Sequence, residues 1–134
     1  MSNSVFIQPD DTFDVVVNWK QDGRKVKILT EPEKDAAGKV LSKSLKVTFR
    51  YPDFATSQQV LKSATTLDQN GMPSLNFLSL QTSLLYGLAK SWDLVDEASK
   101  PVTLDAAAIS KLRVDIAKDL IAKIYAELGD GGLI

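Results

Sequence analysis

The chain of 134 residues contains no cysteine and no histidine. Without Cys there are no disulfides and no thiolate nucleophile, and the N-terminus lacks the basic and apolar regions of a signal peptide, so we expect a cytoplasmic protein. Without His, the commonest general base and the commonest transition-metal ligand are missing. Zinc sites and Ser-His or Cys-His nucleophile systems are therefore excluded. We expect neither an enzyme nor a bound cofactor or metal ion.

Long apolar runs and a strong charge of one sign are also missing. No apolar run approaches the roughly 20 residues of a membrane span, so we expect no membrane partner. The formal net charge is −1, with +2 on residues 1–51 and −3 on residues 52–134. Neither part has the basic footprint of a nucleic-acid binder, and we expect no nucleic acid among the partners. An apolar content of 44% is that of an ordinary globular domain.

The first part of the chain carries strand patterns. Apolar and polar residues alternate over 12–19 and again over 24–30, and the Gln-Asp-Gly sequence at 21–23 is a turn signal, which predicts a β-hairpin. A third alternating run covers 44–51 and ends at a proline, which lacks the amide hydrogen that a ladder requires. The segment 31–43 between these strands is predicted to be an exposed loop.

The rest of the chain carries helical patterns. Asp53 is an expected N-cap for a helix that runs to about residue 67. Ser74 is the expected cap of a very apolar helix to about residue 91, and an irregular connection covers 92–102. Thr103 then caps a last amphipathic helix over 104–128, with Gly129 as its stop.

These patterns together predict an α+β protein of one domain, residues 1–134. Its β-rich part, residues 1–51, forms an antiparallel hairpin within a small sheet of about three strands. Its helical part, residues 53–128, contains three helices. At this length we expect one hydrophobic core that the two parts share.

Two acidic clusters could in principle carry chemistry. Asp10, Asp11 and Asp14 lie near the first strand, and Asp93, Asp96 and Glu97 follow Trp92. The second cluster lacks the glycine and the terminal glutamate of a calcium loop. We therefore interpret both clusters as solvated loop residues.

Trp92 allows two interpretations. A Trp at the end of an apolar helix is usually an anchor that ties this helix to its neighbour. Alternatively, Trp92, Leu94 and Val95 form an exposed anchor for a partner, because Trp is enriched in binding hot spots.

Three stretches of the sequence carry a family resemblance. They are Val47-Thr48-Phe49-Arg50-Tyr51-Pro52 before a helix, Leu88-Ala89-Lys90-Ser91-Trp92-Asp93-Leu94 at the end of the apolar helix, and Lys100-Pro101-Val102-Thr103-Leu104 before the last one. With this order of elements, residues 44–128 resemble the tail assembly chaperones of long-tailed bacteriophages. The usual family pattern has Gly before the Trp, whereas this chain has Ser91.

The resemblance implies a non-enzymatic protein of the host cytoplasm. Its partner would be a helical client, the tape measure protein, kept soluble until tail-tube subunits polymerise around it, and the chain could also form a homo-oligomer. A groove between apolar helices could cover one stripe of the client helix. The alternative is a small structural virion protein of the baseplate, tail or neck. The expected contact residues are Phe54, Leu84, Leu88, Trp92, Leu94 and Val95.

Overall fold

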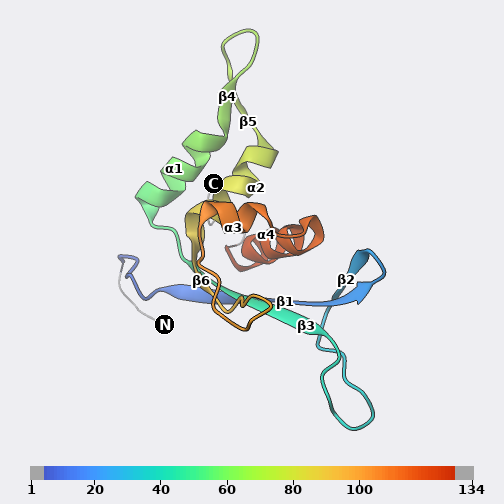
Figure 1. The fold of residues 1–134 in the computed structure, drawn as a ribbon. Helices are drawn as coiled ribbons and strands as arrows, with labels where there is room; N and C mark the ends of the chain where they lie inside the picture. The colour runs from blue at the N-terminus through green and yellow to red at the C-terminus, as the bar shows by residue number, and fades with distance from the viewer. Residues whose placement is uncertain (1–4, 129–134) are drawn as a thin grey trace.

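The computed structural model describes residues 5–128, except the side chains of Phe77 and Leu78. It is an α+β fold in which helices lie against one face of an antiparallel sheet (Figure 1). The expected stop at Gly129 lies outside the described residues. In chain order the elements are β1 (Thr12–Asp22), β2 (Lys25–Leu29), β3 (Lys43–Arg50), α1 (Phe54–Ala64), β4 (Thr65–Leu67), β5 (Pro73–Leu75), α2 (Phe77–Leu88), β6 (Ala89–Trp92), α3 (Ala106–Ser110) and α4 (Val114–Leu128).

The main sheet has four strands in the order β2-β1-β3-β6, and all its neighbours are antiparallel. The three strands expected from the sequence are present. The fourth strand, β6, was missed, because residues 89–91 were assigned to the end of the apolar helix and Trp92 to the irregular connection after it. In the structure Trp92 pairs with Val47 of β3 and Ser91 with Thr48. The apolar helix therefore feeds directly into the sheet.

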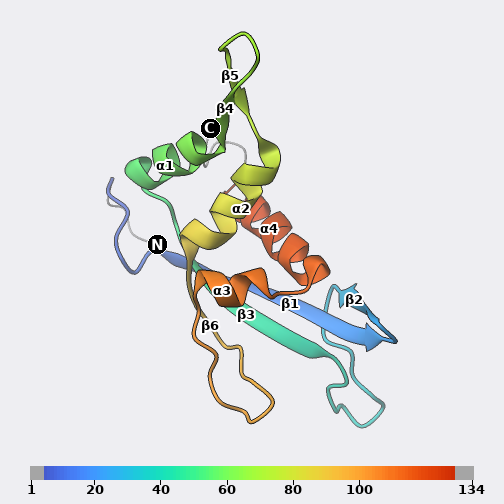
Figure 2. The ribbon, with the colours of Figure 1, turned by 45° about the horizontal axis from the view of Figure 1, so that its top comes forward.

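One face of the sheet forms the floor of the core. The strand alternation places Val15 and Val17 of β1 beside Val47 and Leu45 of β3, all at most 4% exposed. The helices cover this face only, as the two ribbon views show (Figures 1 and 2). Side chains on the opposite face are mostly polar or charged, which is the usual pattern of a one-sided antiparallel sheet.

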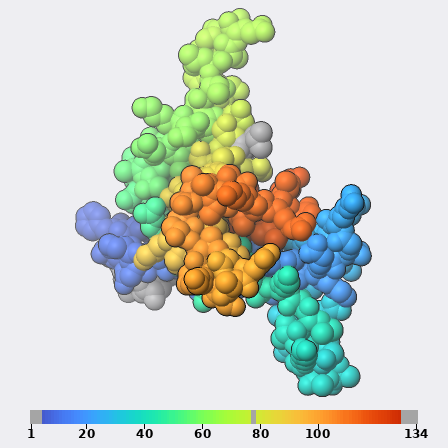
Figure 3. Space-filling view, viewed as in Figure 1, coloured from blue at the N-terminus to red at the C-terminus, as the bar shows by residue number. Residues whose placement is uncertain are grey.

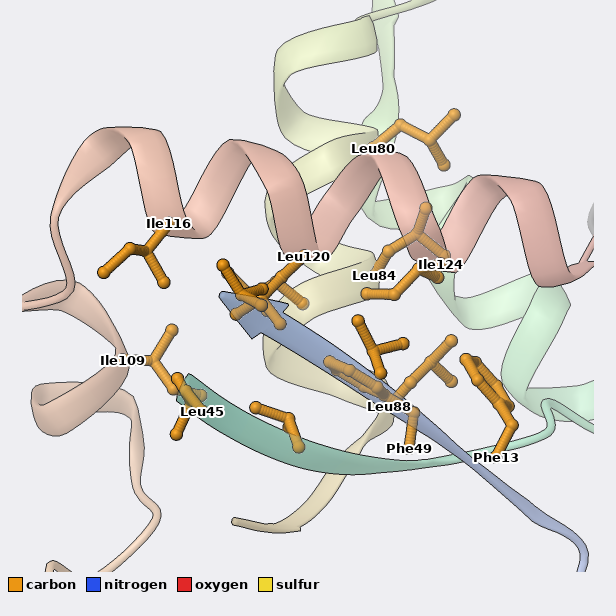
Figure 4. Packing of buried hydrophobic residues seen from close by; sticks show 14 of the residues in the cluster. Phe13, Leu45, Phe49, Leu80, Leu84, Leu88, Ile109, Ile116, Leu120 and Ile124 are labelled. Carbon is orange, nitrogen blue, oxygen red and sulfur yellow. The ribbon is translucent and has the colours of Figure 1, made fainter. Parts of the chain in front are cut away.

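The helices fill the core from above. Figure 4 shows Leu84 and Leu88 of α2 pointing toward Phe49 of the sheet, with Leu120 and Ile124 of α4 beside them. All five side chains are at most 1% exposed. Because strands and helices contribute to the same cluster, the two sequence patterns belong to one hydrophobic core.

The helical part differs from the prediction at three places. The first helix ends at Ala64 instead of residue 67, because two threonines follow it and favour an extended chain. The second helix is capped by the Asn76 side chain and not by Ser74. The last helix is divided into α3 and α4, so the described residues contain four helices and not three. This division lets Ile109 and Ile116 both enter the core from helices with different directions (Figure 2).

Three hairpin arms project from this body (Figures 1 and 3). We call them the 33–41 arm, the 65–75 arm and the 94–102 arm. The second contains the strands β4 and β5, while single β-bridges, Lys34 with Val40 and Val95 with Pro101, close the other two. The sequence patterns predicted a loop, a helix stop and an irregular connection at these places.

The three arms end in the same turn. The carboxylates of Asp35, Asp68 and Asp96 each accept two backbone N–H bonds of 2.8–3.0 Å, from the residues two and four positions later. The third residue after each Asp has a positive φ: 84° at Gly38, 77° at Gly71 and 61° at Ser99. This is a type I turn followed by a left-handed residue, a common connection in hairpins.

Candidate partner-binding surface

Two of the six expected contact residues are inaccessible. Leu84 is 0% exposed and Leu88 is 1% exposed, both packed between the sheet and α4. They were chosen because α2 is apolar around more than one stripe. In the fold these stripes face the sheet and the neighbouring helices, which use the apolar surface internally. A partner that docks on the folded chain cannot reach either leucine, so this part of the expected contact set is corrected.

Trp92 is half-buried at the base of the 94–102 arm. Its ring packs against the core, and its indole N–H donates to the carbonyl oxygen of Val102 at 2.7 Å. The next residue also extends the sheet, because the Asp93 carboxylate accepts the N–H of Lys46 at 2.8 Å. Trp92 is therefore an anchor, but for the 94–102 arm and not for the apolar helix as expected. It fixes the arm that carries Leu94 and Val95.

A groove of about 390 Å³ lies between this arm and α3. Leu94 is half-buried and lines it, whereas Val95 is 50% exposed on the arm. We call this cavity the arm–α3 groove. Its lining residues are Leu94, Val102, Thr103, Asp105, Ala107, Ala108, Lys111 and Leu112.

Two of the polar residues that line the groove, Asp105 and Lys111, lie at the two ends of α3. The Asp105 carboxylate accepts the N–H of Ala108 at 2.8 Å, which caps α3. Lys111 is exposed at the end of the same helix. The apolar wall is formed by Leu94 and Val102 on one side and by Leu112 on the other. Such a surface can bind an apolar stripe flanked by polar residues.

Phe54 lies elsewhere. It is 80% exposed at the first turn of α1, beside the cap residue Asp53. A separate cleft of about 410 Å³ opens here, and its lining includes Arg50, Asp53 and Leu88, the last of which is only 1% exposed. Neither this cleft nor the arm–α3 groove is lined by Phe54, so the structure does not bring Phe54 together with Trp92, Leu94 and Val95.

The hydrogen bonds around α1 explain two pKa shifts. The Asp53 carboxylate accepts the N–H of Thr56 at 2.7 Å, and this bond lowers the pKa of Asp53. Tyr51 donates its phenol hydrogen to Glu127, which, with burial, raises the pKa of Tyr51 to about 12. Both groups hold elements together, Asp53 at the start of α1 and Tyr51 between the sheet and α4.

The acidic residues do not converge. Within residues 5–128, no group of three Asp or Glu is placed to hold a metal ion. Asp93 and Asp96 direct their carboxylates at backbone N–H groups, and Asp14 accepts from the Thr48 hydroxyl at 2.6 Å. These carboxylates serve as local hydrogen-bond acceptors.

The sequence patterns missed the α3 side of the groove. Ala107, Ala108 and Leu112 were assigned to one long helix, whose division at residues 111–113 was not predicted. A signal was present in Asp105, since an Asp immediately before an apolar run is a possible helix start. Thr103 was chosen as the cap instead.

The comparisons with known proteins add no relative: no family model, no curated protein and no solved structure matches this chain. In the described part of the chain, no helix is both long and apolar enough to cross a membrane.

Proposed function

We propose that this chain is a tail assembly chaperone of a long-tailed bacteriophage. In this function it binds an apolar stripe of the helical tape measure protein and releases it when tail-tube subunits polymerise. The proposal rests on the resemblance of residues 44–128 and on one structural observation. The observation is the apolar arm–α3 groove, which lies between two stretches that carry the resemblance, the Trp92 stretch and the segment that leads into the last helices.

The groove suits a helical client. Leu94, Val102 and Leu112 offer an apolar wall, and the half-exposed Val95 extends apolar surface along the arm. Helix-in-groove recognition uses a few apolar anchors spaced along one helix face. At the two ends of α3, the Asp105 carboxylate can accept hydrogen bonds from polar groups that flank such a stripe, and the Lys111 ammonium can donate hydrogen bonds to them.

The size of the groove suits reversible binding. A cavity of about 390 Å³ is at the lower end of ligand pockets in proteins. Large exposed apolar patches favour stable association, whereas separate small ones allow weaker contacts. Exposed apolar side chains such as Phe54, Val95 and Val114 are distributed over separate elements here. A chaperone that must leave its client needs contacts of this kind.

Co-expression with the longest coiled protein encoded near the gene tests the proposal. We expect the wild type to raise the soluble fraction of that protein and to be recovered with it in a pull-down. Val95→Asp places a charge beside the groove, and Ala108→Arg fills the groove. Both should reduce recovery by about ten-fold, because each places a charge against an apolar stripe. Val40→Asp is the matched control, since Val40 is 52% exposed on the 33–41 arm.

Equal recovery with Val95→Asp, Ala108→Arg and Val40→Asp would place the client elsewhere. Absence of any complex with the wild type would refute the chaperone function itself. Circular dichroism and thermal unfolding of each variant separate lost binding from lost folding.

A structural virion protein is the second candidate, and the three projecting arms favour it. Each arm carries exposed apolar residues, including Val40, Leu67 and Val95, on a different side of the body (Figure 3). Such arms can contact several neighbours in a ring or tube. Stable incorporation of the chain into purified particles would support this candidate and count against the chaperone.

A further inference from the structure

One region of the chain is nearly free of charge. Between Lys62 and Lys90 the only charged residue is Asp68, although 25% of the whole chain is charged. This region includes the 65–75 arm and α2. Depletion of charge is a property of the centres of protein interfaces. The buried faces of α2 explain part of this depletion of charge, but the 65–75 arm is mostly exposed.

The 65–75 arm has little support from the rest of the molecule. It projects from the ends of α1 and α2, well away from the main sheet (Figures 1 and 3). Leu67 is 71% exposed and Met72 is 61% exposed. An isolated two-stranded hairpin is marginally stable in water, so an arm of this kind gains from an additional strand.

The free edge of β4 has a definite pattern of donors and acceptors. The backbone N–H of Asp68 donates to the carbonyl of Met72, and the backbone N–H of Asn76 donates to the carbonyl of Ala64. These two pairs are therefore the hydrogen-bonded pairs of the β4–β5 ladder. Bonded and non-bonded pairs alternate in an antiparallel ladder. Thr65 and Leu67 therefore direct their backbone groups away from β5. The Thr65 N–H is already bonded to the Lys62 carbonyl.

The edge of β4 thus presents the Leu67 N–H as a donor and the Thr65 carbonyl as an acceptor. We propose that β4 pairs antiparallel with β4 of a second copy of this chain, around a two-fold axis at Thr66. In this register each Leu67 N–H donates to the Thr65 carbonyl of the other copy. The two hairpins then form a continuous four-stranded sheet. Because the Thr65 N–H is already bonded to the Lys62 carbonyl, each Thr65–Leu67 pair makes one of its two ladder bonds, and the Leu67 carbonyl oxygen stays exposed to water.

A surface groove on α1 continues this interface. Its volume is about 570 Å³, and it extends to Thr65, the first residue of β4. In the antiparallel register, the arm of the second copy runs back along α1, with its tip over this groove. Its lining residues are Ala55, Gln58, Gln59, Leu61, Lys62 and Thr65.

The charges match the same register. Asp68 is the only charged residue of the arm, and Lys62 is the only charged residue of the groove. When Leu67 pairs with Thr65 of the other copy, Asp68 of one copy approaches the end of α1 in the other copy. That end of α1 carries Lys62. The edge, the groove and these charges are therefore complementary to a second copy of the chain itself.

The absence of native cysteine gives a direct test. Residues that face each other as a non-hydrogen-bonded antiparallel pair have Cα atoms about 4.5 Å apart, within the range of a disulfide. Thr66→Cys should therefore form a disulfide-linked dimer of the purified protein in a glutathione buffer. Ala36→Cys, at the exposed tip of the 33–41 arm, is the matched control. We expect the Thr66→Cys dimer to form at least about ten times faster, because pairing raises the local thiol concentration.

A second pair of variants tests the hydrogen bonds. In the Thr66→Cys background, Leu67→Pro removes the edge donor without removing a β4–β5 bond, whereas Leu67→Ala keeps the donor and removes the same side chain. We expect Leu67→Pro to slow dimer formation to the control rate and Leu67→Ala to retain most of it. Equal rates for Thr66→Cys and Ala36→Cys, or for the proline and alanine variants, would overturn the proposal. The client is not needed, so the result is independent of the chaperone function.

Discussion

The indole N–H of Trp92 and the carbonyl oxygen of Val102 form a hydrogen bond of 2.7 Å across the base of the 94–102 arm. The same tryptophan pairs with Val47 in the main sheet. Trp92 therefore ties the arm to the sheet, and the arm forms one wall of the arm–α3 groove. The geometry of the candidate binding surface depends on this residue even though its side chain is only partly accessible.

Trp92→Phe tests the anchoring role. Phenylalanine keeps an aromatic ring in the core but cannot donate to Val102, whose carbonyl loses its partner. We expect a loss of about 1–2 kcal/mol in the free energy of unfolding. Urea denaturation followed by circular dichroism measures it. Trp19→Phe is the control, since the Trp19 ring also packs against the core but its indole N–H forms no hydrogen bond within residues 5–128. An equal loss in both variants would contradict the role of the Val102 bond.

Ser99 occupies a position where the other two arms have glycine. Its φ of 61° is unfavourable for a side chain with a Cβ, whereas Gly38 and Gly71 adopt similar angles without this cost. Ser99→Gly should therefore stabilise the protein by up to about 1 kcal/mol. Thermal unfolding measures the change. Gly71→Ser is the reciprocal variant, and it should be destabilising; stabilisation by Gly71→Ser would show that the turn conformation is not limiting.

The strands of the main sheet could be predicted because their side chains alternate strictly. Phe13, Val15 and Val17 share the buried face of β1, and Leu45 and Val47 continue it on β3. Because one face is buried and the other is polar, a shift of the pairing register by one residue would expose the apolar side chains, so the register is strongly specified. β6 could not be recognised in this way, because its four residues, Ala-Lys-Ser-Trp, directly follow α2 and have no alternating pattern of their own.

The arms were missed for a different reason. Their stability comes from a local turn, in which Asp35, Asp68 and Asp96 bind backbone N–H groups, and not from a hydrophobic pattern. The sequence signal is an Asp followed three residues later by Gly or Ser. Asp68 with Gly71 fits it well, but a glycine turn also ends a helix, and this second explanation was chosen.

The candidate site was only partly predictable. Trp92, Leu94 and Val95 are adjacent in sequence and remain on one arm, so a local argument could place them together. Their counterparts Ala108 and Leu112 come from α3 and the residues after it, and only the tertiary fold brings them to the arm. Leu84 was assigned to the surface because an excess of apolar residues does not indicate which neighbour covers them.

Arg50 ties the end of β3 to the end of α2. Its guanidinium donates to the Gly87 carbonyl at 3.0 Å, near the C-terminus of α2, where a positive charge also interacts favourably with the helix dipole. Arg50→Met should lower the free energy of unfolding by about 0.5–1 kcal/mol. Lys46→Met, on the same strand and also exposed, is the control. An equal loss in both variants would indicate an effect of net charge only.

Tyr51 makes the stability of the fold dependent on alkaline pH. The hydrogen bond to Glu127, burial, and the nearby carboxylates of Glu127 and Asp11 raise its pKa from 10.0 to about 12. Between these values the folded protein keeps a phenol proton that the unfolded chain has released. Because the folded state then binds more protons, the free energy of unfolding falls as pH rises through this window.

Tyr51→Phe tests this coupling. The variant lacks the titrating phenol, so its stability should fall less than that of the wild type between pH 10 and about 12. Urea denaturation at a series of pH values gives the two curves. Burial also raises the pKa of Tyr125, but this group is present in both proteins and its contribution cancels in the difference. Parallel curves across the window would show that Tyr51 keeps no stabilising proton, and its contact with Glu127 would then not connect the sheet to α4 in solution.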